Sequence, residues 1–239
     1  MLDTIRTITV IAAIVINFGA VAAAIPARAA TRLGFLIAVG LWAGFAFAIT
    51  QNGALRGAIG GTAIPPIGIV VAIPLLAAAL AAALSPAFRR TALALPTNLL
   101  IGLNVYRVLG IFMLLLAVQG RVPGPFPYLA GLGDIITGVL AVPAVIGLQR
   151  GSNRSTALAW NAFGMLDLVV ALASGMMTAP GPLQVFATGL SGPFVMLTLP
   201  WSLIPTVLVP FYLIVHGIIF AQLWQDRATG LTAIGYAGS

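Results

Sequence analysis

The sequence predicts an all-α membrane protein with seven transmembrane helices, and three observations support this fold class. Of the 239 residues, 61% are hydrophobic and 6% are charged, which leaves too few polar side chains to cover a soluble domain. Apolar runs of about 20 residues, the length of a helix that crosses a bilayer, recur along the whole chain. These runs are apolar on all sides, whereas the strands of a membrane barrel would alternate apolar and polar residues.

Prolines and glycines separate the apolar runs and mark the turns between helices. We expect the helices at about 5–25, 33–50, 66–84, 97–119, 128–148, 157–177 and 200–223. Because these segments and their short connections use nearly all of the chain, residues 1–239 are expected to form one transmembrane domain surrounded by lipid.

The first segment also resembles a signal peptide, because Ala27-Arg28-Ala29 offers an Ala-x-Ala sequence. The placement of the arginines decides between a signal peptide and a first transmembrane helix, since cytoplasmic loops carry an excess of arginine. With an outside N-terminus, the inner side receives Arg28, Arg32, Arg89, Arg90, Arg150, Arg154 and Arg227, and the outer side Arg6, Arg56 and Arg121. Cleavage would move most of them to the wrong side. We therefore expect segment 5–25 to be helix one of a bacterial inner-membrane protein, with the C-terminus inside.

Missing residue types exclude several function classes. The chain has no cysteine, and it also lacks the lysine that a retinal Schiff base requires. Its one histidine, His216, is too few for a zinc or bis-histidine haem site. The net charge of +7 comes from arginines in short loops, which indicates topology rather than nucleic acid binding. The sequence favours a protein without cofactor, metal or catalytic activity.

The first three helices are rich in alanine and glycine, and Asn17 is one of their few polar residues. Small residues let helices approach closely. We interpret these helices as scaffold or as a packing surface for a partner membrane protein, with a bias in composition as the alternative.

Helix 97–119 carries Arg107 near its middle, where an arginine costs roughly 2.5–3.5 kcal/mol on insertion scales. At about 100° per residue, Thr97, Asn104, Arg107 and Gln119 fall on one face of a continuous helix. This face is expected to point into the protein, where Arg107 has an acidic partner.

The next two helices supply that partner. In helix 128–148, Asp134 shares a face with Gly131, Thr137 and Gly138, and the glycines let a backbone or a ligand approach. In helix 157–177, Asn161, Gly164 and Asp167 share an arc.

Helix 200–223 contains Pro205 and Pro210, each of which removes a backbone donor, and His216. The carbonyl groups freed by the prolines could bind a cation or a hydroxyl group. Trp160, Trp201, Trp224 and Tyr128 fall near the expected membrane boundaries, as in an interfacial belt.

Ideal helical rise places Asp134 at about 9 Å, Asp167 at about 15 Å, Arg107 at about 18 Å and His216 at about 24 Å from the outer boundary. Arg107 and the aspartates are therefore expected to meet, with His216 deeper and not required in the cluster. One arginine facing two aspartates leaves a negative charge, which a proton, a bound cation or protonated His216 would neutralise.

Two other patterns lie in the connection between the last two expected helices. Gly189-Leu-Ser191-Gly192 matches the nucleophile motif of rhomboid proteases, but about 25 residues of helix would separate Ser191 from His216 by nearly 40 Å. We therefore interpret the match as a coincidence. The surrounding stretch 178–199 is apolar and uncharged, and it is expected to lie on the membrane or to cap the cavity between the fourth and seventh helices.

Short motifs in the last four helices resemble a set of uncharacterised bacterial integral membrane proteins. They are Val105-Tyr106-Arg107, Gly131-Leu-Gly133-Asp134, Trp160-Asn161 with Asp167, and Leu203-Ile204-Pro205 with Val209-Pro210. The resemblance implies no activity.

The sequence therefore favours a polar site in the last four helices that binds a small solute, a cation or a proton, and it leaves open whether the protein transports that ligand. Its expected residues are Arg107, Asp134, Asp167, Asn104, Asn161 and His216. The alternative is an accessory or assembly subunit of a larger membrane complex, in which the charges form structural ion pairs.

Overall fold

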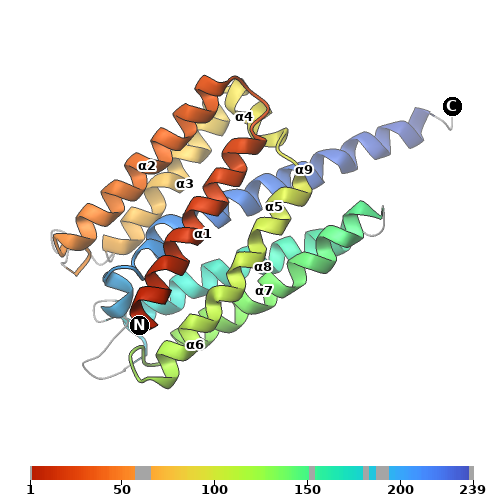
Figure 1. Ribbon diagram of the computed structural model, residues 1–239. Coiled ribbons are helices and arrows are strands. Elements are labelled where there is room, and N and C mark those ends of the chain that lie inside the picture. The colour runs from red at the N-terminus through yellow and green to blue at the C-terminus, as the bar shows by residue number, and fades with distance from the viewer. Residues whose placement is uncertain (1, 57–65, 151–153, 180–182, 187–193, 237–239) are drawn as a thin grey trace.

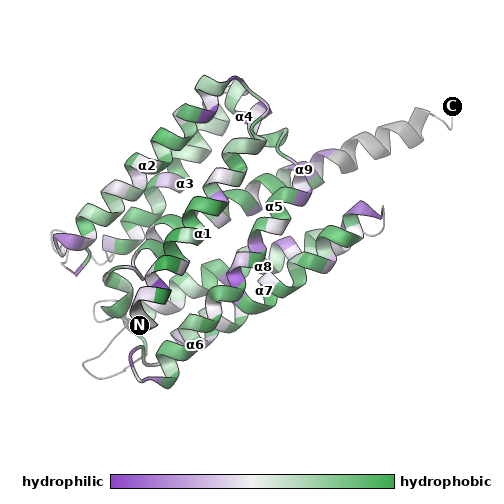
Figure 2. Cartoon of the chain, viewed as in Figure 1, coloured by the Kyte–Doolittle hydropathy of each residue, from purple (hydrophilic) through white to green (hydrophobic). Residues whose placement is uncertain are grey.

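The protein is an all-α bundle in a computed structural model that describes residues 2–56, 66–150, 154–179, 183–186 and 194–236 (Figure 1). Seven helical spans in this part of the chain are long and apolar enough to cross a membrane. The protein is thus a multi-pass membrane protein. Figure 2 shows hydrophobic colour along most of each helix and hydrophilic colour at helix ends and in an interior stretch where α5 and α6 pass α8.

The first half of the chain forms α1 (Leu2–Ala24), α2 (Ala29–Gln51), the 3₁₀ turn η1 (Ala54–Arg56) and α3 (Pro66–Leu84). A short helix, α4 (Pro86–Leu93), follows within a stretch that the sequence was expected to use as a loop. The Ser85 hydroxyl group caps α4 by accepting the Phe88 N–H, and Pro86 occupies the first turn, where no N–H is needed.

The span that carries Arg107 is not the continuous helix that was expected. It consists of α5 (Thr97–Leu103), a 3₁₀ segment η2 (Asn104–Gly110) and α6 (Ile111–Val118). A 3₁₀ helix turns about 120° per residue instead of 100°, so these 7 residues add about 140° of rotation. The predicted polar face is broken for this reason: Asn104 and Arg107 are buried, whereas Gln119 is exposed.

The remaining spans are α7 (Phe126–Gln149), α8 (Arg154–Thr178) and α9 (Val209–Tyr236). Another 3₁₀ turn, η4 (Phe194–Leu197), and a π-helical segment, η5 (Ile204–Leu208), precede α9. In Figure 1, α7 and α8 run side by side, while α2 and α3 lie on the opposite side of α1.

The π segment reflects the two prolines that the sequence places there. Pro210 has no N–H to give to the carbonyl group of Thr206 in an α-helical pattern. That carbonyl accepts a 2.8 Å hydrogen bond from the indole Nε1 of Trp42 instead. The free carbonyl anticipated from the prolines therefore binds a side chain of α2, and it ties the first half of the bundle to the second. A 3.0 Å hydrogen bond between Thr50 and Ser202 adds to this connection.

Candidate functional site

Four helical spans bring the ionisable residues of the membrane interior together around Arg107. Its Nε donates a 2.7 Å hydrogen bond to Asp134 Oδ1 in α7, and its Nη2 donates to Asp167 Oδ2 in α8. Its Nη1 donates to the Gly164 carbonyl at 3.1 Å and lies 3.0 Å from His216 Nε2 in α9. We call Arg107, Asp134, Asp167, Asn161 and His216 the Arg107 cluster.

The guanidinium group of Arg107 is almost fully occupied by protein groups. The contacts above use all but one of its N–H groups, and its side chain is 2% exposed. A buried guanidinium group held by two carboxylates is also the arrangement expected of an ion pair that fixes helix packing. Arg107 therefore has little capacity left to bind a ligand directly.

Hydrogen-bond geometry fixes the state of His216. Because an arginine N–H can only donate, Nε2 of His216 must accept it. Nδ1 then carries the proton and donates to Asn161 Oδ1 at 2.8 Å, while Asn161 Nδ2 donates to the His216 carbonyl at 3.0 Å. An imidazolium would place an N–H against the Arg107 N–H. Protonated His216 therefore does not supply the positive charge that balances the second carboxylate.

His216 is also closer to Arg107 than its estimated depth suggested. The estimate treated each span as straight and parallel to its neighbours, whereas α9 is inclined to α1 in Figure 1. The 3₁₀ segment that carries Arg107 rises about 2.0 Å per residue instead of 1.5 Å, which further shifts the register. The two residues are in direct contact as a result.

Glycines let the four spans approach closely enough to make this cluster. A Cβ atom on Gly138 would lie 2.7 Å from the backbone N of Val108, so the glycine admits the η2 backbone to α7. One on Gly164 would lie 2.6 Å from His216 Cε1, and one on Gly133 would meet the carboxylate of Asp167. The close approach expected at Asp134 is thus made by a neighbouring backbone, that of Gly110 with Gly131.

Trp160 packs against the Arg107 cluster. Its indole Nε1 donates to the Thr137 carbonyl at 3.0 Å, and its ring centroid is 5.4 Å from that of His216. Trp160 and Trp201 are buried in the protein, whereas Trp224 and Tyr128 are exposed, and the depth of these residues in the bilayer stays a prediction. Both buried indoles lie in the protein core because they have polar or aromatic partners there.

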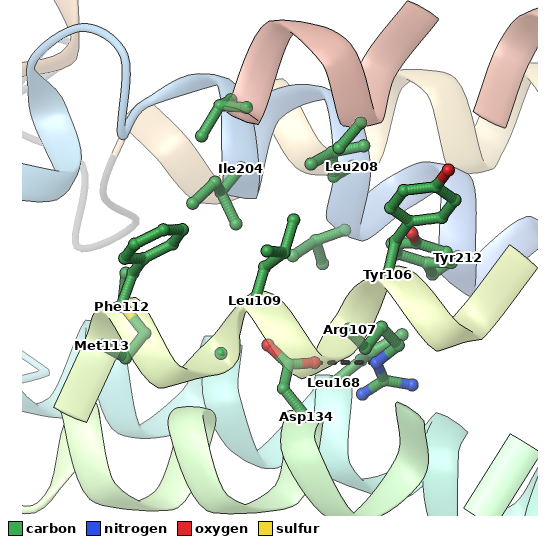
Figure 3. A pocket seen from close by; sticks show the side chains of 14 residues that line it. Tyr106, Arg107, Leu109, Phe112, Met113, Asp134, Leu168, Ile204, Leu208 and Tyr212 are labelled. Carbon is green, nitrogen blue, oxygen red and sulfur yellow. Dashed lines mark hydrogen bonds and ion pairs between the residues drawn. The ribbon is translucent and has the colours of Figure 1, made fainter. Parts of the chain in front are cut away.

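A cavity of about 60 Å³ adjoins the cluster on the side of Asp134 (Figure 3). Its walls come from α1, η2, α6, α7, α8, η5 and α9, and Arg107 and Asp134 are its charged lining residues. The side chain of Asp134 is 23% exposed, whereas that of Asp167 is 5% exposed. The two carboxylates therefore differ: Asp167 is enclosed by Arg107 and α7, and Asp134 faces open space.

The first helix takes part in this site, in addition to the scaffold role expected for it. Val10 and Ala13 line the cavity, and Asn17 is fully buried. The Tyr212 hydroxyl group lies 3.3 Å from Asn17 Oδ1 and 3.4 Å from the Leu103 carbonyl. The guanidinium carbon of Arg107 stands 5.9 Å from the centre of the Tyr212 ring.

Of the predicted site residues, Arg107, Asp134, Asp167, Asn161 and His216 are brought together, and Asn104 is not. Asn104 is buried but donates to the carbonyl of Leu100 in its own helix at 3.0 Å, and its Oδ1 has no partner. Sequence reasoning did not place Tyr212 in the site, although Tyr212 lies on the same face as His216, one turn earlier in the chain.

The stretch 178–199 is described only in part. Val185 and Phe186 donate backbone hydrogen bonds of 2.8 and 3.0 Å to the Met177 carbonyl. Met196 of η4 is buried with Met113 and Trp201 in an apolar cluster next to the cavity. Ser191 and its rhomboid-like motif lie outside the described residues. Within those residues, no group of three or more His, Cys, Asp or Glu side chains could hold a metal ion.

Comparison with known proteins gives one finding. A family model described as a domain of unknown function, DUF8737, matches residues 64–224, which include α3 to α8 and most of the α9 span. Neither the comparison with curated proteins nor the comparison with solved structures found a match.

Proposed function

The chain belongs to the DUF8737 family, and we propose that it binds a proton or a small cation at Asp134 and carries this ion, alone or with a small solute, across the bilayer. One observation supports the proposal above all others. The carboxylate of Asp134 lines a cavity among apolar side chains and is 23% exposed, although it belongs to an ion-pair cluster inside the membrane span.

Charge balance supports binding at this carboxylate. The Arg107 cluster contains one guanidinium group and two carboxyl groups, and hydrogen bonding keeps His216 neutral. With both aspartates ionised, an apolar region would hold an unpaired negative charge, which is costly. A proton or cation that binds from the cavity removes this cost. In this proposal Arg107, Asp167, Asn161 and His216 position Asp134 and set its charge.

Two irregular helical segments support movement of the bound ion. The 3₁₀ segment η2 supplies Tyr106, Arg107, Leu109 and Gly110 to the cavity wall, and the π segment η5 supplies Ile204 and Leu208. Such segments inside helices often mark hinges and functional sites. Both lie against the same cavity, so a change in either would alter access to Asp134.

Proton flux into proteoliposomes, measured with an enclosed pH-sensitive dye, tests the proposal. We expect Asp134→Asn to abolish flux while retaining most of the folded protein, because the amide keeps the shape of the side chain. Ser85→Ala, which removes the cap of the distant helix α4, is the control and should leave flux unchanged. Equal flux in wild type and Asp134→Asn would contradict the proposal.

A structural role as an accessory subunit is the second candidate, and the saturation of Arg107 by protein groups favours it. The 18-residue windows that define α2 and α3 are each only 11% buried, which leaves surface for a partner membrane protein. Stoichiometric co-purification of another membrane protein in mild detergent would support this role. A monomer that shows Asp134-dependent flux would rule it out.

The proposal places the chain in a bacterial inner membrane as one domain, with the N-terminus outside. The arginine distribution supports this orientation. Because the chain has no cysteine, single cysteines can report on it directly. In intact cells, a membrane-impermeant thiol reagent should label Gln51→Cys at the outer end of α2 and spare Ala87→Cys in α4. The reverse pattern would invert the orientation.

A further inference from the structure

We infer that the cavity beside Asp134 binds a small alkylammonium ion, which displaces a proton from the carboxyl group. The inference rests on the function proposed above and names the class of its ligand. It follows from the charge, the shape and the chemistry of the cavity lining.

The lining is apolar except at one side. Val10 and Ala13 of α1, Leu168 of α8 and Leu208 and Val209 around η5 form a large part of the wall. Figure 3 shows Tyr106 and Tyr212 at one end of the cavity, Phe112 and Met113 at the other, and the Asp134 carboxyl group between them. The ligand that suits this space has an apolar body and one polar group.

The polar group must be a cation or a hydrogen-bond donor. Asp134 Oδ1 accepts from Arg107, and its other oxygen receives no hydrogen bond from the residues that the structure describes. Four of the five Arg107 N–H groups donate within the cluster. An anion would therefore meet a carboxylate with at most one N–H group to offset the repulsion.

Inorganic cations fit the cavity poorly. Small metal ions need about six oxygen ligands to replace their water. The side chains of the lining that carry oxygen are those of Asp134, Tyr106 and Tyr212, and the hydroxyl group of Tyr212 lies near Asn17 and Leu103. An alkylammonium ion needs fewer polar partners, because its carbon atoms pack against the apolar wall. The rings of Phe112 and Tyr212 add faces that attract cations.

The cavity volume limits the size of the ligand. A volume of about 60 Å³ is several times the roughly 10–15 Å³ that one water molecule needs in a cavity, so it accommodates a ligand of a few non-hydrogen atoms. Methylammonium and ethylammonium, with two and three non-hydrogen atoms, suit this space. Tetraethylammonium is larger and has no N–H group to donate to Asp134.

Binding exchanges one cation for one proton. The neutral carboxylic acid of Asp134 releases its proton, and the resulting carboxylate pairs with the incoming ammonium group. Charge in the cavity is the same before and after, so neither state leaves a buried charge unpaired. The charged and titratable groups around Asp134 are Arg107 of η2, Asp167 of α8 and Tyr212 of α9, while His216 of α9 contacts Arg107 and Tyr106 lines the cavity.

Titration of the purified full-length protein with methylammonium chloride in weakly buffered detergent solution tests the inference. We expect about one proton released per ion bound. Where Asp134 is protonated, the apparent Kd should rise about tenfold for each unit of pH lowered, as one-proton exchange requires. Potassium, acetate and tetraethylammonium should neither bind nor release protons. Asp134→Asn should lose both binding and release.

Two cavity variants separate shape from charge. Ala13→Leu fills the cavity from α1 and should remove methylammonium binding, while infrared spectroscopy still detects the protonated Asp134 carboxyl group. Val10→Ala enlarges the cavity and should shift preference toward propylammonium. The second variant remains informative if the first does not fold.

Failure of the inference differs from failure of the proposed function. If Asp134 binds a proton but methylammonium displaces none, or if potassium displaces it equally well, the alkylammonium assignment is wrong and the proton site stands. If Asp134 shows neither protonation nor flux, both are wrong.

Discussion

Two parts of the bundle differ in how much of their surface is buried against protein. The 18-residue windows of α2 and α3 are each 11% buried, and their exposed side chains are apolar residues such as Leu41 and Leu76. The span from Thr97 to Val118 is 44% buried and the span from Ile204 to Gln225 is 56% buried, and these spans carry Arg107 and His216. Among the residues that the structure describes, the outer helices make few side-chain hydrogen bonds to other spans, those of Trp42 and Thr50 in α2, whereas the inner spans are joined by the hydrogen bonds of the Arg107 cluster.

This difference shows where sequence changes should matter. A lipid-facing position requires only an apolar side chain, because lipid and a leucine side chain are equally apolar. A position in the Arg107 cluster depends on several partners at once, so its loss leaves other buried groups unpaired. Substitutions in the cluster or its surroundings should therefore cost more than matched substitutions outside it.

The largest effect is expected for Arg107→Leu, which leaves Asp134 and Asp167 without their counter-charge. Removing one partner of a buried ion pair costs about 3–5 kcal/mol. Unfolding in mixed detergent and SDS micelles, followed by circular dichroism, should show this loss. Arg89→Leu in the exposed helix α4 is the control and should change the free energy of unfolding by less than about 0.5 kcal/mol.

A combined variant checks the reason for that loss. Arg107→Leu with Asp134→Asn and Asp167→Asn removes all three charges, so it should recover much of the stability lost by the single variant. If the triple variant is less stable than Arg107→Leu alone, packing rather than unpaired charge accounts for the effect.

Gly164→Ala should have the next largest effect. The new Cβ would lie 2.6 Å from His216 Cε1 and 2.8 Å from Thr137 Cγ2, and such overpacking costs typically about 1–3 kcal/mol. Gly40→Ala in α2 is the matched control, because nothing lies within 4 Å of its Cβ position. It should be neutral or stabilising by up to about 1 kcal/mol. If Gly164→Ala changes the free energy of unfolding no more than Gly40→Ala does, the close contact at Gly164 carries no energetic cost.

Trp42→Phe tests the connection between the two parts. It removes the donor to the Thr206 carbonyl but keeps an aromatic ring, and an unpaired buried acceptor costs about 1–3 kcal/mol. Trp224→Phe, at a side chain that is 59% exposed, should have no measurable effect. Thermal unfolding monitored at several probes would reveal whether α2 separates from α9 first in Trp42→Phe.

The smallest effect is expected for Leu76→Ala in α3, a side chain that faces the bilayer. The free energy of unfolding should change by less than about 0.5 kcal/mol. Leu100→Ala, at a position with no exposure, should cost about 2–5 kcal/mol because it leaves a cavity. Similar losses at both positions would show that α3 is covered by protein in the solution used.

The sequence was sufficient to predict the seven spans and the contact of Arg107 with both aspartates. Length and apolarity define a span, and an arginine inside one requires an acidic partner. Contacts that depend on helix irregularity could not be predicted. The 3₁₀ segment moved Gln119 out of the polar face, and the inclination of α9 brought His216 to Arg107. The role of Asn17 depends on α1 packing against α9, which no local pattern indicates.

The irregular segment at Arg107 also changes the length of its span. A 3₁₀ helix rises about 2.0 Å per residue, so the 7 residues of η2 make the span about 3.5 Å longer than the same residues in an α-helix. Bilayers differ in hydrocarbon thickness by a few ångströms, and mismatch costs a fraction of a kcal/mol per ångström. A thicker membrane should therefore suit the longer 3₁₀ segment better than a thinner one does. We expect lipid chain length to affect the geometry of the Arg107 cluster.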